Sequence, residues 1–156
     1  MHITSWIFAL ALLVLPATSW SQAHEQQFGA YTLHSSTVGS ENLSPQTARK
    51  HGIERSPTRA VLNVTLSKDK QTIPAQVDVS ARSLTGQTRQ IGMQETRTGN
   101  DVSYTGSYEF VHGEVLDFTI HATPRGSDKV LSMAYRERLW GPGDLPEPAP
   151  RQGVPD

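Results

Sequence analysis

The alternation of apolar and polar residues at every second position is the feature that most constrains the fold of this chain. It is clearest over residues 60–66, AVLNVTL, where every second side chain is apolar. The pattern recurs in six further stretches: 31–33, 75–81, 91–93, 102–110, 116–122 and 131–135. A period of two places apolar side chains on one face of a strand and polar side chains on the other. The sequence therefore predicts about seven half-buried strands.

Turn residues separate these runs. Thr98-Gly99-Asn100-Asp101 and His112-Gly113-Glu114 are two examples, and each lies between two alternating stretches. Short strands joined by such turns, without helices long enough to cross between parallel strands, are typical of antiparallel sandwiches. We predict an all-β protein, an immunoglobulin-like antiparallel β-sandwich of about seven strands. A small barrel is the alternative.

One segment departs from the strand pattern. Ser44 is a favourable N-cap, Pro45 suits the first position of a helix, and Gly52 suits the residue that ends one. Residues 45–51 are therefore predicted to form a short helix. It would lie in the first long loop, around residues 35–59.

The N-terminal residues have the form of a secretory signal peptide. Residues 7–15 are continuously apolar, a run too short to span a bilayer. Ser21-Gln22-Ala23 fits the small-x-small cleavage pattern, and Ala17-Thr18-Ser19 is a second candidate. We assign residues 1–23 to the signal and expect a periplasmic protein without a membrane span.

The C-terminal residues, 141–156, contain five prolines and three glycines. Such a composition cannot form a packed core, so a disordered tail is expected there. The folded domain is predicted to occupy residues 24–140. No internal repeat divides it.

The composition excludes several chemistries. The chain has no Cys, so disulfides, thiol nucleophiles and thiolate metal sites are excluded. Its formal net charge of −1 argues against a nucleic-acid-binding protein. No cofactor is expected. Packing and strand pairing alone must stabilise the domain.

Four short pieces of sequence resemble a known family. They are residues 28–34, 51–56 with 60–64, 73–77 with 84–87, and 123–127. In this order they resemble a family of small exported proteins of gammaproteobacteria, known only as a domain of unknown function. The resemblance implies a periplasmic protein with a single domain. It implies no activity and no catalytic residue.

Basic residues gather around the predicted helix and form a candidate binding site. Arg49, Arg55, Ser56 and Arg59 lie within eleven residues. Arg55 has the fork geometry that suits a carboxylate or phosphate, and Ser56 would add a hydroxyl. The alternative interpretation is structural, with Arg55 holding the loop by bonding backbone carbonyls.

The histidines suggest a second hypothesis. His34, His112 and His121, with the methionines, would be the ligands of a copper-type chaperone. No two of these histidines have the spacing of a metal motif. Our leading prediction therefore includes no metal site.

These observations favour a non-enzymatic periplasmic binding or adaptor module. It would bind an envelope protein or a small anionic ligand, through an exposed edge strand or the loop around residues 35–59, as a monomer or weak dimer. The metal-handling chaperone is the alternative, and an envelope hydrolase is a weaker one. The chain has no G-x-S-x-G nucleophile motif, and we expect no enzyme activity.

Overall fold

The computed structural model describes residues 21–141. Ten strands form two antiparallel sheets. The first sheet has the order β1 (Ser21–Phe28), β2 (Tyr31–Gly39), β3 (Arg59–Lys68), β8 (Asp101–Glu109) and β7 (Gln94–Thr98), with β4 (Gln71–Thr72) paired to β3. The second has the order β10 (Leu131–Arg138), β9 (Val115–Pro124), β5 (Ala75–Ser83) and β6 (Thr88–Ile91). The predicted fold class, an antiparallel β-sandwich of immunoglobulin-like type with one short helix, is confirmed.

The number of strands is larger than predicted, for identifiable reasons. β1 has the sequence SQAHEQQF, which lacks apolar alternation because it lies at a sheet edge. β4 is only two residues long. The stretch predicted as one strand around residues 91–93 instead ends β6 and leads through Gly92 and Met93 into β7. Periodicity alone cannot detect strands that are this short or this polar.

The described part of the chain begins with β1. Ser21, Gln22 and Ala23 precede His24 in that strand and pair with residues of β2. The predicted domain start at residue 24 therefore falls within a strand, whereas cleavage after Ser19 would leave the whole strand in place. The rest of the predicted signal peptide and the predicted tail from residue 142 onward lie outside the described residues.

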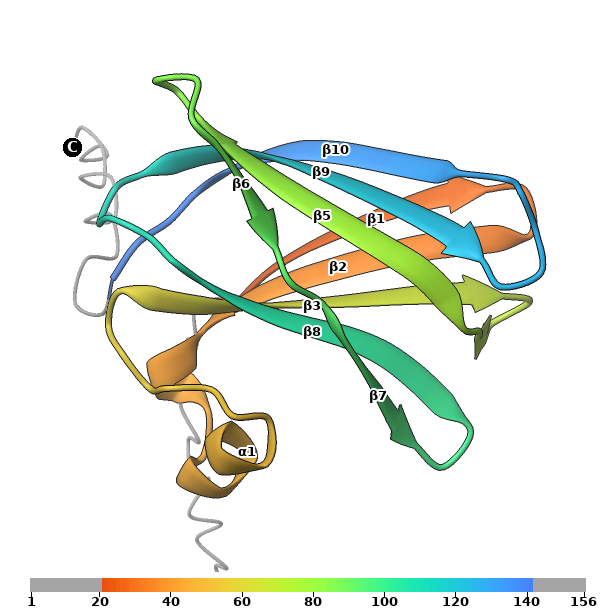
Figure 1. Cartoon of the computed structure of the whole chain (residues 1–156), viewed down its shortest axis with the longest axis horizontal. Helices are drawn as coiled ribbons and strands as arrows, with labels where there is room; N and C mark the ends of the chain where they lie inside the picture. Colours follow the sequence, from red (N-terminus) through yellow and green to blue (C-terminus); the bar gives the residue numbers. More distant parts are fainter. Residues whose placement is uncertain (1–20, 142–156) are drawn as a thin grey trace, which may run out of the picture.

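The two sheets are joined along both sides. On one side the chain passes directly from β6 in the second sheet to β7 in the first (Figure 1). The hydroxyl of Tyr104 also accepts a hydrogen bond from the Ala75 amide at 2.7 Å, which links β8 to β5. On the other side Gln22 of β1 donates to the carbonyl of Arg138 in β10 at 3.5 Å. The edge strands β1 and β10 therefore lie beside each other, and we call this junction between the two sheets the β1–β10 seam.

The core lies between the sheets, on the faces that the alternation predicts. Val64 and Leu66 on β3, and Phe118 and Ile120 on β9, are fully buried. Tyr104 and Tyr108, the two aromatic residues of β8, also point inward. Burial of this apolar surface is the main stabilising term for a domain without disulfides.

The predicted helix is present as α1 (Pro45–Lys50), which projects beyond one end of the sandwich (Figure 1). The Ser44 hydroxyl accepts from the Thr47 amide at 3.1 Å, as an N-cap does. Gly52 has a φ of 62°, a conformation that favours glycine. The connection containing α1 is shorter than predicted, since β2 continues to Gly39. Within residues 21–141 no helix is long and apolar enough to cross a membrane.

Candidate functional site

An acidic residue occupies an inward position of β10. The alternation of that strand places Met133, Tyr135 and Glu137 on the inner face of the second sheet, which faces the core. Leu139, two residues after Glu137, is also buried. The side chain of Glu137 has 0 % of its surface exposed. Burying a carboxyl group is unfavourable unless other groups compensate it. The surroundings of Glu137 therefore decide what this position can do.

Polar side chains from four strands surround Glu137. They are His24 on β1, Ser35 and Thr37 on β2, Tyr108 on β8, and Tyr135 on β10 beside Glu137 itself; we call these six residues the polar cluster. Within it the Thr37 hydroxyl donates to Glu137 Oε2 at 3.3 Å. The Nε2 atom of His24 lies 3.6 Å from the same oxygen. The cluster therefore joins the β1 and β10 edges of the sandwich.

A column of rings fixes the position of the histidine. His24 stacks on Tyr135 with ring centroids 3.8 Å apart and an interplanar angle of 16°. Tyr135 in turn stacks on Phe118, and Tyr108 meets Phe118 edge to face. A hydrogen bond of 2.8 Å between the hydroxyls of Tyr135 and Ser35 holds the middle ring. His24 is thus oriented toward Glu137 although its side chain is 30 % exposed.

The polar cluster contains atoms without hydrogen-bond partners. Four buried side-chain polar atoms within residues 21–141 lack a hydrogen bond of good geometry. Three of them, His24 Nε2, Tyr108 Oη and Glu137 Oε1, belong to the polar cluster, and the fourth is Nε of Arg59. Buried polar groups are normally satisfied, and each exception needs an explanation. Three exceptions in one cluster mark it as a candidate binding site.

Burial also changes the acidity of these groups. It raises the pKa of Glu137 to about 7, an effect that the Thr37 hydrogen bond partly offsets. Burial lowers the pKa of His24. It raises the pKa of Tyr108 and Tyr135, and the nearby Glu137 carboxyl raises both further. The polar cluster therefore favours neutral forms of its own groups and would gain from a positive charge placed among them.

The predicted basic site is engaged in local interactions. Arg49 donates through Nε to the carbonyl of Pro45 in its own helix at 3.2 Å. Arg55 donates through Nη2 to the Glu41 carbonyl at 2.7 Å. The hydroxyl of Ser56 bonds that of Thr58 at 3.1 Å. These contacts agree with the structural interpretation, in which Arg55 holds the loop through a backbone carbonyl.

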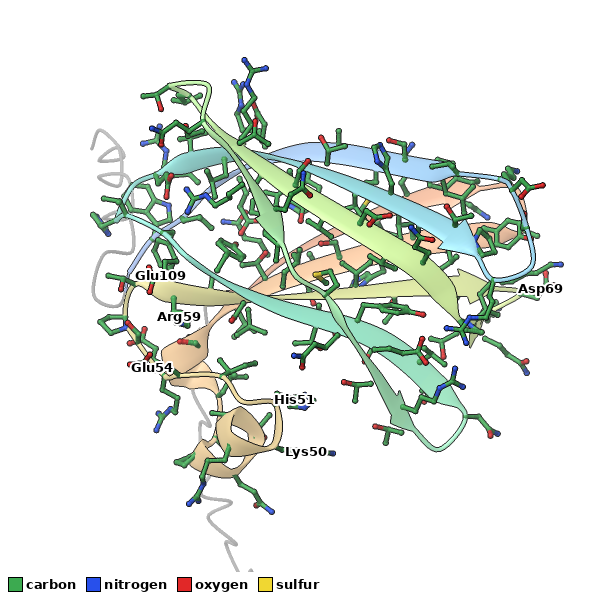
Figure 2. All side chains as sticks on the ribbon, viewed as in Figure 1. Lys50, His51, Glu54, Arg59, Asp69 and Glu109 are labelled. Carbon is green, nitrogen blue, oxygen red and sulfur yellow. The ribbon has the colours of Figure 1, made fainter. Side chains whose placement is uncertain are left out.

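Arg59 is also paired. Its Nη2 atom lies 2.7 Å from Oε1 of Glu109 and 3.8 Å from Oε2 of Glu54 (Figure 2). A cleft of about 240 Å³ beside α1 is lined by other residues, among them His51 and Gln94. The four basic-site residues therefore do not converge on that cleft.

Replacing Arg55 by alanine is expected to lower the free energy of unfolding by about 1 kcal/mol without changing phosphate affinity. One charge-assisted hydrogen bond is lost, and because Arg55 is exposed the loss is small. Urea denaturation measures the first effect and calorimetric titration with inorganic phosphate the second. Arg49→Ala, whose bond stays within one helical turn, is the control. Phosphate binding by the wild type that Arg55→Ala abolishes would restore the anion hypothesis.

The histidines of the copper hypothesis lie on separate elements. His34 is half-buried on β2, and His121 is exposed on β9 in the other sheet. His112 lies in the β8–β9 turn, where its ring meets Trp140 edge to face at 5.3 Å and its Nδ1 accepts from the Gly141 amide. No group of three or more His, Cys, Asp or Glu side chains suited to a metal ion occurs in the described part of the chain.

Polar residues at inward strand positions were the one sign of the polar cluster in the sequence, and a search for alternating apolar residues does not detect them. Ser35 and Thr37 continue the inward phase of Leu33, and Glu137 continues that of Tyr135. A carboxylate in phase with a buried face is the unusual observation. His24 gives no such signal, since its strand has no apolar alternation to define a phase.

The DUF4426 family, described as a domain of unknown function, matches residues 25–141. A DUF4426 family protein from Pseudomonas aeruginosa is similar in structure, with 23 % identity, a TM-score of 0.70, and coverage of 76 % of this chain and 95 % of that one. The predicted resemblance to a gammaproteobacterial family of unknown function is confirmed. No curated protein matches the chain.

FetP of uropathogenic Escherichia coli is a more distant structural relative. A copper-bound variant of FetP, in which glutamine replaces one glutamate, is 11 % identical with a TM-score of 0.58, and the match covers 78 % of this chain and 99 % of that one. FetP isolated after expression in the periplasm is 10 % identical, also with a TM-score of 0.58, over 78 % and 97 % of the two chains. At these identities the likeness establishes the fold alone.

Proposed function

We propose, from the premise that this chain belongs to the DUF4426 family, that it is a non-enzymatic binding module of the periplasm. Its ligand would be a small ion or molecule held by the polar cluster. The observation that carries the proposal is the concentration of unpartnered buried atoms: His24 Nε2, Tyr108 Oη and Glu137 Oε1. A bound group that met all three would remove the cost of leaving them unsatisfied.

The periplasmic location rests on two supports. The first is the signal peptide predicted over residues 1–23. The second is the fold shared with FetP, which was obtained by expression in the periplasm. A chain without cysteine has no need of the oxidising compartment for its stability. The location is therefore proposed from targeting rather than from chemistry of the domain.

A binding role agrees better with the polar cluster than hydrolysis does. Ser35, the hydroxyl nearest to His24 in the sheet register, is fully buried and bonded to Tyr135. A nucleophile must reach its substrate and be hydrogen-bonded to its base. Glycoside hydrolysis would require a second carboxylate facing Glu137, whereas the group 3.6 Å from its Oε2 atom is the imidazole of His24. The proposal is therefore non-enzymatic.

Metal handling is the second candidate function, and one observation favours it. FetP, which shares the fold, is recorded in a copper-bound form. In this chain the donors fit an ion of borderline softness: an imidazole nitrogen and a buried carboxylate that face each other. They do not fit a soft, sulfur-bound Cu(I) ion, since Met133 is packed in the core and Met93 packs against it.

The test is to ask what the protein carries. Wild-type protein, Glu137→Gln and Glu25→Gln are exposed to the low-molecular-weight fraction of a periplasmic extract and examined by native mass spectrometry. Glu25 is the matched control, since it follows His24 on β1 and its side chain is exposed. Wild type and Glu25→Gln are expected to retain an added mass that Glu137→Gln lacks. If all three proteins have the mass of the bare chain, the proposal fails.

A further inference from the structure

The His24–Glu137 pair has the composition and spacing of two ligands of one metal ion. Typical bonds from zinc to histidine nitrogen and to carboxylate oxygen are about 2.0–2.2 Å. Two ligand atoms at such distances lie about 3–3.7 Å apart when the angle at the metal is between 90° and 120°. The observed separation between His24 Nε2 and Glu137 Oε2 is 3.6 Å. The pair therefore lies at a distance that a single ion can bridge.

The supporting contacts resemble those that position metal ligands. The ring of His24 is held by its stack on Tyr135, and Oε2 of Glu137 is held by the Thr37 hydroxyl. Contacts that hold a ligating side chain in place orient it toward the metal and tune its basicity. Neither His24 Nε2 nor Glu137 Oε1 makes a hydrogen bond to any residue between 21 and 141. Nε2 has a lone pair for an ion in the tautomer whose ring proton is on Nδ1, and Oε1 has one when the carboxyl group is ionised.

Access and charge agree with a cation as the ligand. Glu137 and the Nε2 atom of His24 are both buried, and the rest of the His24 side chain, 30 % exposed in total, is the part of the pair that reaches the surface at the β1 edge. Arg89 acts electrostatically on Tyr108 but is itself paired with Glu114. Among residues 21–141 the only ion-pair partner of the Glu137 carboxylate is His24, which carries a charge only when it is protonated. An uncompensated buried carboxylate is costly, and a bound metal ion would offset that cost.

We propose that His24 Nε2 and the carboxylate of Glu137 bind a divalent transition metal ion, with Cu²⁺ bound more tightly than Zn²⁺. The order follows from the donor set, because nitrogen and oxygen sites bind Cu²⁺ most strongly among the first-row divalent ions. Tyr108 and solvent at the β1 edge complete the surroundings of the ion. This assignment rests on the proposed function, since it names the ligand of the same polar cluster.

The experiment is a calorimetric titration of EDTA-treated, full-length protein with Cu²⁺ and with Zn²⁺, supported by electron paramagnetic resonance of the Cu²⁺ complex. Wild type is expected to bind one Cu²⁺ with nitrogen coordination. His24→Gln and Glu137→Gln should each weaken binding more than about tenfold. His121→Gln is the control, an exposed histidine of β9 outside the polar cluster. Near-ultraviolet circular dichroism confirms that each variant is folded.

Three results would overturn the metal assignment: no Cu²⁺ binding by wild type, unchanged affinity in His24→Gln, or an equal loss in His121→Gln. The last would instead support the copper hypothesis based on the outer histidines. The result also separates this assignment from the proposed function. If wild type retains an organic mass that Glu137→Gln loses, and binds no Cu²⁺, the binding role stands and the metal ligand is wrong.

Discussion

Replacing Glu137 by glutamine is expected to stabilise the metal-free protein by about 3 kcal/mol at pH 8 and to leave its stability nearly unchanged at pH 4. The free carboxyl has a pKa of 4.5 in the reference state and about 7 in the folded protein. Between these values the folded protein retains a proton that the unfolded chain has lost. The stability of the wild type therefore falls as the pH rises from 4.5 to 7 and stays low above 7. Glutamine cannot ionise, so the variant lacks this loss.

Urea denaturation of wild type, Glu137→Gln and Glu25→Gln at several pH values, in the presence of EDTA, measures the effect. His24 contributes in the opposite direction: its lowered pKa removes stability as the pH falls below 6.5, and it does so in all three proteins. The difference between wild type and Glu137→Gln isolates the carboxyl, while Glu25→Gln should follow wild type. A Glu137→Gln variant less stable than wild type at pH 8 would show that the ionised carboxylate is stabilised by its surroundings.

The same variant connects stability to the proposed metal site. An ion that binds the folded protein raises its stability in proportion to the logarithm of ligand concentration over Kd. Added Cu²⁺ at pH 8 should therefore recover part of the stability that the wild type loses through Glu137. The Glu137→Gln variant starts from a higher stability and gains little from the ion. A site of this kind exchanges folding stability for binding, as functional sites commonly do.

The fold was largely predictable from local pattern, whereas the polar cluster was not. Strands such as β3 and β9 bury one face and expose the other, so their alternation in sequence specifies them. The start of α1 was also predictable, because the Ser44 cap and Pro45 at the first helical position act within a few residues of each other in the sequence. β1 has no such pattern. Its place at the sheet edge depends on pairing with β2 over its whole length.

The polar cluster depends on contacts between residues far apart in the chain. His24 and Glu137 come together only because the β1 and β10 edges meet at one seam of the sandwich. The inward phase of Glu137 was visible in the sequence, but its partner could not be identified without the order of the strands. The basic residues are conspicuous in the sequence, but their partners are not. In the fold Arg55 donates to the Glu41 carbonyl and Arg59 pairs with Glu109 on the neighbouring strand, and the anion site stays a prediction.

The second large effect is a loss of stability, expected from a substitution at Gly106. This residue of β8 packs against the segment that joins β6 to β7. A Cβ atom at this position would lie 2.6 Å from the Gly92 carbonyl oxygen, 2.7 Å from Sδ of Met93 and 2.9 Å from Cγ2 of Ile91. The methionine can move, but the carbonyl belongs to the backbone that carries the chain from one sheet to the other. We therefore expect Gly106→Ala to lower the free energy of unfolding by about 3 kcal/mol, at the upper end of overpacking effects.

Gly92→Ala is the matched control for that substitution, because nothing lies within 4 Å of its Cβ position and its φ is not in the left-handed region. It should unfold within about 1 kcal/mol of wild type, consistent with substitutions at open positions. Thermal and urea denaturation of both variants compare the two glycines directly. Equal stability of Gly106→Ala and Gly92→Ala would mean that the passage between the sheets can shift without cost. A selective loss in Gly106→Ala would show that close backbone approach at this crossing is required to keep β6 and β7 in different sheets.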